Sequence, residues 1–183
     1  MSTRVKQIVQ LNAKLVSVDK QECQKLKVFG ELLVMTTPHV VKRRFTFSAA
    51  HRLPQVSEDH KCHYVHGHNY TVDVEVGTVS LNECNFVLDF KELDFFEEFL
   101  RNEFDHKLLV WEKDEKLVQI AFQNSDVFAV KVIPVTPTCE ELAELFALYV
   151  ASVLTNMLSK DFKVRVTVWE SDKSCASYET KLT

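Results

Sequence analysis

Glycine is scarce in this chain, which has only three glycines among its 183 residues. Gly30, Gly67 and Gly77 cannot compose the G-x-G-x-x-G or G-x-x-x-x-G-K-[ST] loop that cradles phosphate groups, so Rossmann and P-loop nucleotide binding are excluded at motif level. Long apolar runs are absent as well. No stretch approaches the roughly 18 apolar residues of a membrane span, and polar residues interrupt the first 15 positions. We expect a soluble cytoplasmic protein with no signal peptide and no membrane partner.

The chain also lacks an excess of positive charge, because its formal net charge is -4. The only dense basic run, Lys42-Arg43-Arg44, is best interpreted as a solvated strand end, so we predict no nucleic-acid partner. Cysteine is present five times, an odd number with no C-x-x-C pair. This pattern argues against a disulfide framework and against a four-cysteine zinc module. The length and average composition predict one main globular domain with an appendage.

Residues 1–40 are predicted to be an N-terminal extension, because the segment lacks clear periodicity and reaches a break at Pro38. Residues 41–183 form the predicted catalytic domain. Runs of β-branched and alternating apolar residues predict strands at 40–47, 70–76, 116–122, 127–133 and 164–168, with the third and fourth joined as a hairpin. Capping-box sequences and apolar periodicity predict helices at about 90–104 and 139–158. The order indicates an α+β domain with a largely antiparallel sheet.

Histidine is concentrated in one short segment. Five of the seven histidines fall between positions 51 and 68: His51, His60, His63, His66 and His68. On an extended segment, His66 and His68 share one face, and His51 can approach them from the end of the preceding strand. Three imidazoles on a tetrahedral zinc leave one open position, which is typical of a catalytic site. Two alternatives stay open: Cys62 as a fourth ligand of a closed structural zinc site, and a loop of solvent-exposed histidines.

Two longer stretches resemble the 6-pyruvoyl-tetrahydropterin synthase family: residues 45–54 (FTFSAAHRLP) and 60–70 (HKCHYVHGHNY). Three residues separate Cys62 from His66, as in the 6-carboxytetrahydropterin synthase branch of queuosine biosynthesis, whereas the pyruvoyl branch has five. A third branch, which releases a hydroxymethylpterin, places a glutamate in this loop, and none is present here. The resemblance covers about residues 41–178 and includes Val87-Leu88-Asp89-Phe90, Asp105-His106, Pro137-Thr138-Cys139-Glu140 and Val168-Trp169-Glu170.

The resemblance implies a zinc site with a proton-transfer set beside it. The implied Zn2+ ligands are His51, His66 and His68. Cys62 is the implied general base, because a thiolate near a dication can have a pKa well below the usual value of about 8.5. Asp105 and His106 are the implied proton-transfer pair, the carboxylate setting the tautomer and basicity of the imidazole. Each has a structural alternative, a buried inert thiol for Cys62 and a dipole-complementing histidine at a helix end for His106.

For the substrate, the resemblance implies contacts from four further residues. Glu170 would anchor the pterin, since a carboxylate accepts two parallel hydrogen bonds from the 2-amino and N3 edge of the ring. Glu140 has a supporting role in this interpretation, and Thr138 already suffices as a helix N-cap. Lys61 would meet the triphosphate.

As a whole, the resemblance implies a zinc-dependent lyase that converts 7,8-dihydroneopterin triphosphate to 6-carboxy-5,6,7,8-tetrahydropterin, acetaldehyde and triphosphate. It also implies the tunnelling fold, an antiparallel sheet with two helices on one face, whose subunits join into barrels and form a homohexamer of two trimers. The alternatives are a 6-pyruvoyl-tetrahydropterin synthase and a non-catalytic zinc- or pterin-binding protein. Two departures from short family members are residues 1–40 and the long stretch between His106 and Pro137.

Overall fold

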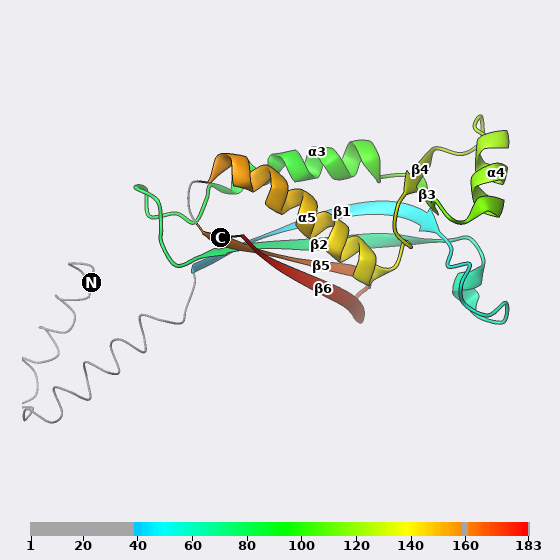
Figure 1. The fold of residues 1–183 in the computed structure, drawn as a ribbon, viewed down its shortest axis with the longest axis horizontal. Helices are drawn as coiled ribbons and strands as arrows, with labels where there is room; N and C mark the ends of the chain where they lie inside the picture. The colour runs from blue at the N-terminus through cyan, green and yellow to red at the C-terminus, as the bar shows by residue number, and fades with distance from the viewer. Residues whose placement is uncertain (1–38, 159–160, 183) are drawn as a thin grey trace, which may run out of the picture. The chain divides into compact units, whose positions relative to one another are not determined.

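The computed structural model describes residues 39–158 and 161–182 (Figure 1). Six strands form one sheet in the order β4-β3-β1-β2-β5-β6. Their bounds are β1 His39–His51, β2 His66–Thr78, β3 Lys107–Trp111, β4 Val130–Ile133, β5 Phe162–Ser171 and β6 Ser174–Leu182. The α-helices are α3 Asp94–Glu103, α4 Glu115–Gln123 and α5 Cys139–Met157, and two short 3-10 helices are η1 Lys61–His63 and η2 Phe90–Leu93. The predicted α+β class is confirmed.

The hydrophobic core lies between the sheet and helices α3 and α5, which cover the same face (Figure 1). Successive side chains of β2 and β5 point to opposite faces of the sheet, so every second residue faces these helices. Val72, Val74 and Val166 are among the fully buried valines on this face. Aromatic rings fill the space between the layers, as where Phe104 meets Phe146 with ring centroids 4.9 Å apart. Burial of each such side chain stabilises the fold by about 2 kcal/mol, so sheet and helices hold each other in place.

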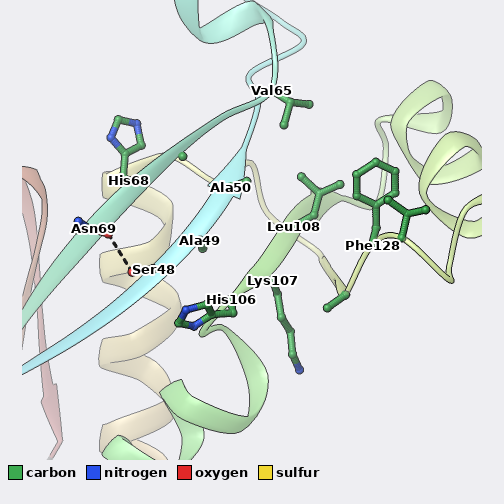
Figure 2. A pocket seen from close by; sticks show the side chains of 13 residues that line it. Ser48, Ala49, Ala50, Val65, His68, Asn69, His106, Lys107, Leu108 and Phe128 are labelled. Carbon is green, nitrogen blue, oxygen red and sulfur yellow. Dashed lines mark hydrogen bonds between the residues drawn. The ribbon is translucent and has the colours of Figure 1, made fainter.

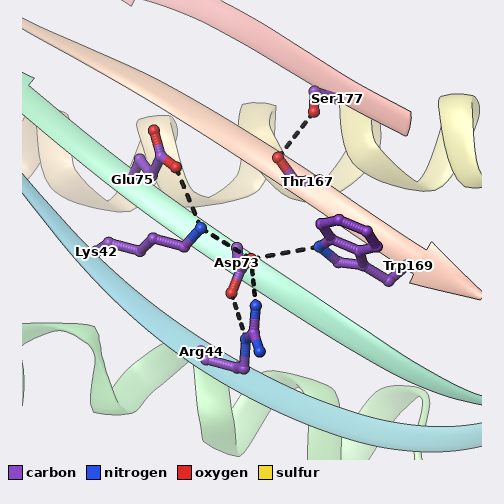
Figure 3. A network of polar contacts seen from close by, with 7 residues as sticks. All are labelled: Lys42, Arg44, Asp73, Glu75, Thr167, Trp169 and Ser177. Atoms are coloured by element: carbon purple, nitrogen blue, oxygen red, sulfur yellow. Dashed lines mark hydrogen bonds and ion pairs between the residues drawn. The ribbon is translucent and has the colours of Figure 1, made fainter. Parts of the chain in front are cut away.

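On the opposite face of the sheet, α4 packs on Leu108 and Val110 of β3. Over β1, β2 and β5 this face is polar and is organised around Asp73 of β2, whose side chain is 0% exposed (Figure 3). Arg44 of β1 donates to both carboxylate oxygens, at 2.7 and 2.9 Å, and Lys42 Nζ lies 2.9 Å from Oδ2. Trp169 Nε1 of β5 donates to the same oxygen at 3.3 Å. The contacts with Arg44 and Lys42, with the Arg44 hydrogen bond the largest cause, lower the pKa of Asp73 to about 2. One buried carboxylate therefore joins three strands.

The predicted hairpin at 116–133 is wrong. Residues 115–123 form α4, and β4 pairs in parallel with β3, not with a neighbouring hairpin strand. The alternation of Val118, Ile120 and Phe122 is typical of a strand, but Ile120 and Phe122 are exposed. The buried pair, Leu117 and Ala121, has the four-residue spacing of a helix face. Asp114 begins the helix by accepting a hydrogen bond from Leu117 N, which is N-capping.

The sheet is also mixed, since β1–β3 and β3–β4 are parallel while β1–β2, β2–β5 and β5–β6 are antiparallel. The remaining predicted strands and helices are present, with β1 and β2 longer than expected and the first helix opening as η2. The proposed extension falls outside the described residues up to position 38, so the boundary at 40 stays a prediction. Within the described part of the chain, no helix is both long and apolar enough to cross a membrane.

Candidate metal centre

Strand register brings three imidazoles together at one end of the sheet. His51, the last residue of β1, lies directly opposite His66, the first residue of β2, and His68 lies opposite Ala49. All three project from the face that α5 covers, because they continue the alternation that buries Ala49 and Tyr70. One ligand nitrogen from each of the three rings lies within 4.8 Å of the other two. The predicted convergence of His51, His66 and His68 is therefore present in the structure.

In two of the three rings, a main-chain carbonyl determines which nitrogen is available. His51 Nδ1 lies 2.6 Å from the carbonyl oxygen of Pro137, and His66 Nδ1 lies 2.8 Å from that of Tyr64. A carbonyl only accepts hydrogen bonds, so each Nδ1 carries the proton and each Nε2 keeps its lone pair. The Nε2 atoms of all three histidines are buried and have no hydrogen-bond partner among the described residues. Three converging nitrogens without hydrogen-bond partners, two of them with a free lone pair, fit a divalent metal.

The environment of His51 and His68 favours the neutral form of both rings. Burial is the main reason that the pKa of His51 falls to about 4, and the adjacent His66 and His68 add to the effect. Burial likewise lowers the pKa of His68, against the opposing influence of Glu170. A metal competes with protons for the same lone pairs, so these shifts favour metal binding at neutral pH.

Glu170 lies beside the histidines. It follows Trp169, which pairs with Thr71, and it therefore lies next to Tyr70 on the histidine side of the sheet. Cys139, the first residue of α5, donates its thiol proton to Glu170 Oε2 across 3.7 Å. Burial and the Glu170 charge raise the pKa of Cys139 to about 12. The hydroxyl of Tyr70 is buried and has no hydrogen-bond partner within the described ranges, so an unsatisfied donor also lies at this end of the sheet.

The other predicted substrate and base residues surround this group on two short segments. Cys62 is half-buried on η1, where its amide donates to His60 Nδ1 at 3.1 Å, and Lys61 beside it is exposed. Thr138 caps α5 by accepting a hydrogen bond from Glu141 N at 3.3 Å. Glu140 is exposed on the first turn of α5. Position alone assigns none of these four residues a role toward a substrate or a proton.

Asp105 and His106 lie at a different place, between α3 and β3. Asp105 Oδ1 accepts the amide of Ser48 at 2.8 Å, the main cause of its lowered pKa, and Oδ2 lies 2.8 Å from His106 Nδ1. His106 has a left-handed φ of 58°, and its side chain is 82% exposed. It shares a pocket of about 500 Å³ with His68, and Figure 2 shows strand β1 between the two rings. In the described part of the chain, no hydrogen bond or ion pair joins this pair to the histidine cluster.

Comparison with known proteins identifies the family. The family model for 6-pyruvoyl tetrahydropterin synthase matches residues 40–181. The chain belongs to this family. A 6-carboxy-5,6,7,8-tetrahydropterin synthase of Aquifex aeolicus is 28% identical over 144 residues, which cover 76% of this chain and 89% of the relative. The recognised resemblance and the prediction of an enzyme, a lyase of this family, are confirmed.

Solved structures share the fold at lower identity. A protein of Wolinella succinogenes is 18% identical, covers 78% of this chain and 98% of its own, and superposes with a TM-score of 0.67. A catalytic-residue mutant of Plasmodium vivax 6-pyruvoyltetrahydropterin synthase is 15% identical, covers 80% of this chain and 100% of its own, and gives a TM-score of 0.62. The predicted fold class is therefore confirmed for the single chain.

Family motifs lead to most of the site, but not to all of it. The carbonyls of Pro137 and Tyr64 escape sequence reasoning, because main-chain groups carry no sequence signal of their own. Cys139 stands at the variable position of the family's P-T-x-E motif, and Tyr70 follows the H-G-H motif by two residues. Both positions are visible in the sequence, but only the structure shows that they adjoin Glu170.

Proposed function

We propose that the chain is a zinc-dependent lyase that converts 7,8-dihydroneopterin triphosphate and water to 6-carboxy-5,6,7,8-tetrahydropterin, acetaldehyde and triphosphate. The observation that carries the proposal is that three imidazole nitrogens without hydrogen-bond partners lie on the same face of the sheet as a carboxylate, that of Glu170. Three neutral histidines leave a position open for substrate oxygen. The three-residue spacing from Cys62 to His66 and the name of the Aquifex relative favour the 6-carboxy product.

In this proposal, His51, His66 and His68 hold the zinc through their Nε2 atoms. When bound, the metal supplies Lewis acidity that favours ionisation of a hydroxyl group on the side chain of the substrate. Cys62 removes a proton from the substrate side chain, and its place on η1, four residues before His66, brings it to the metal end of the sheet. Glu170 orients the ring by accepting hydrogen bonds from its 2-amino and N3 edge.

The remaining predicted roles extend outward from these groups. Glu140 supports pterin binding and Lys61 meets the triphosphate, which agrees with the exposure of both side chains. Asp105 and His106 relay protons, with Asp105 holding the imidazole orientation through Nδ1. Because His106 is 82% exposed and has no contact with the three histidines among the described residues, it suits a site that is completed where subunits meet. A homohexamer of two trimers is part of the proposal.

Product analysis tests the reaction. Zinc-loaded protein is incubated with 7,8-dihydroneopterin triphosphate, and the products are separated and identified by mass spectrometry, with acetaldehyde assayed by trapping. We expect 6-carboxytetrahydropterin and acetaldehyde in equal amounts. A product that keeps all three side-chain carbons would indicate a 6-pyruvoyl-tetrahydropterin synthase. Tight pterin binding without any turnover would indicate a non-catalytic pterin-binding protein.

A further inference from the structure

The segment from Pro137 to Cys139, which leads into α5, contacts both halves of the proposed site. The carbonyl of Pro137 accepts the Nδ1 proton of His51 at 2.6 Å, and two residues later the thiol of Cys139 donates to Glu170 Oε2 at 3.7 Å. Thr138 between them caps the helix and fixes its start. A metal ligand on β1 and a carboxylate on β5 are therefore held by one short segment that belongs to neither strand.

The thiol of Cys139 is suited to donating a proton and not to losing one. A cysteine at a helix N-terminus usually has a lowered pKa, because the helix dipole favours the thiolate. Here burial and the Glu170 and Glu140 charges outweigh that effect and raise the pKa to about 12. Cys139 is only 8% exposed. At neutral pH, Cys139 is therefore a buried S–H group directed at a carboxylate. It acts as a hydrogen-bond donor and not as a nucleophile.

A fixed carboxylate plane is what a pterin requires. The ring presents two parallel donors, the 2-amino group and N3–H, so both carboxylate oxygens must lie in the plane of the ring. A glutamate side chain rotates freely about its terminal torsion unless a neighbour restrains it. The contact from Cys139 occupies one lone pair of Oε2 and leaves Oε1 and a second lone pair for the ligand.

We propose that Cys139 is a positioning residue that holds the Glu170 carboxylate in the orientation needed to read the donor edge of a pterin. The inference rests on the proposed function in taking Glu170 as the pterin anchor. The inference adds that the preference for ligands with a 2-amino group depends on Cys139 as well as on Glu170, although Cys139 does not itself touch the ligand. The α5 start thereby couples the placement of the metal ligand His51 to that of the substrate anchor.

The test compares Cys139→Ala and Cys139→Ser with Cys84→Ser, a matched change at an exposed cysteine. Equilibrium binding to the zinc-loaded protein is measured with two fluorescent probes: pterin, and lumazine, which carries a carbonyl in place of the 2-amino group. We expect Cys139→Ala to lower the preference for pterin over lumazine about tenfold, because a hydrogen bond to a charged group is lost. Cys139→Ser, whose hydroxyl still donates, should stay within about threefold of wild type.

Two further measurements separate positioning from general damage. Zinc content and the thermal midpoint should remain close to wild type in all three variants, since a structural role would alter them. The S–H stretching band of Cys139, obtained as the infrared difference between wild type and Cys139→Ser, should be lowered in frequency by its hydrogen bond. It should rise when the acceptor is weakened in Glu170→Gln. This measurement requires neither substrate nor turnover.

Several outcomes overturn the inference: unchanged discrimination in Cys139→Ala, a Cys139→Ser variant as poor as Cys139→Ala, or an S–H band at the frequency of an unbonded thiol. Failure of the proposed function has a different signature. In that case wild-type protein binds pterin and responds to the Cys139 variants, but gives no 6-carboxytetrahydropterin. If wild-type protein binds neither probe, both proposals fall.

Discussion

At the scale of single residues, the proposed metal site depends on which nitrogen of each imidazole is left free. His66 has its Nδ1 proton directed at Tyr64 O, so its Nε2 faces the centre of the cluster. Replacement of His66 or His68 by alanine leaves two imidazoles, which is too few for a stable tetrahedral site. We expect wild type to carry about one zinc per chain and both variants to lose it in elemental analysis. Unchanged zinc in both would move the ligand assignment to Cys62, His60 or His63.

Cys62 is expected to act on protons and not to hold the metal. If three histidines are the ligands, Cys62→Ala should retain its zinc and lose turnover by about a hundredfold to ten-thousandfold, the usual contribution of a general base. Elemental analysis and steady-state kinetics on the same preparation give both values. A metal-free Cys62→Ala protein would instead make Cys62 a ligand. Normal turnover with zinc retained would leave it without a role in catalysis.

Glu170 should affect ligand binding far more than folding. Glu170→Gln keeps the shape of the side chain but replaces an acceptor oxygen with an amide donor that opposes the pterin 2-amino group. Because the residue is half-buried at a strand end, we expect a change of only a few degrees in the thermal midpoint, with a loss of about a hundredfold in kcat/KM. Parallel losses of stability and activity would indicate a structural role for Glu170.

At the scale of strands and helices, the Asp73 cluster predicts a pH-dependent stability. The folded-state pKa of about 2 lies below the ordinary 3.8, so the unfolded chain binds the proton more tightly. The stabilisation is therefore complete above about pH 5 and is lost as the pH falls toward 2; the shift corresponds to about 2 kcal/mol. Asp73→Asn should cost a similar amount at pH 7, because Arg44 and Lys42 are half-exposed and can be rehydrated.

Urea unfolding at a series of pH values checks this expectation. The difference in unfolding free energy between wild type and Asp73→Asn should be about 2 kcal/mol at pH 7 and should shrink steadily below pH 4. Glu179→Gln provides a control, because that carboxylate also forms ion pairs but is exposed. A gap between wild type and Asp73→Asn that stays constant down to pH 3 would contradict a lowered pKa in the folded state.

Elements with one strong period could be predicted from the sequence, and elements that depend on tertiary contacts could not. The alternation of β2 and the capping box of η2 are local signals, and both are confirmed. The segment at 115–123 carries two competing patterns: a short apolar helix face and an alternation of apolar residues that is typical of a strand. The packing of Leu117 and Ala121 against β3 decides between them in favour of a helix. Strand β3 is only five residues long and is paired in parallel with two strands from distant parts of the sequence.

The basic run and the histidine cluster also depend on contacts between distant parts of the chain, which the sequence alone does not predict. The sequence indicates a solvated strand end for Lys42-Arg43-Arg44, but β1 is an internal strand, and the two outer residues pair with Asp73 from the neighbouring strand β2. The cluster of His51, His66 and His68 could be proposed because the three residues are close in sequence and belong to a family motif. The carbonyl that orients His51 lies 86 positions further along, where sequence spacing carries no information about proximity.

At the scale of the whole molecule, the edge of the sheet at β6 predicts assembly. Strand β6 is nine residues long and pairs only with β5 among the described strands, so its outer edge offers unpaired main-chain donors and acceptors. Pairing such edges between subunits removes the hazard of uncontrolled aggregation. We expect light scattering and native mass spectrometry to give six times the 21.2 kDa of one chain, with trimers at low concentration. A monomer at all concentrations would contradict the proposed homohexamer.

The long separation between His51 and Pro137 also bears on when the site is formed during synthesis. Strands β1 and β2 can pair as soon as residue 78 is available, which brings the three imidazoles together early. The carbonyl that directs the His51 proton arrives only after another 59 residues have been added. Contacts across such distances form late, because closing a long loop costs entropy before any contact rewards it. We therefore expect the nascent hairpin to present a loosely organised set of imidazoles, and the docking of α5 to define one tautomer at His51.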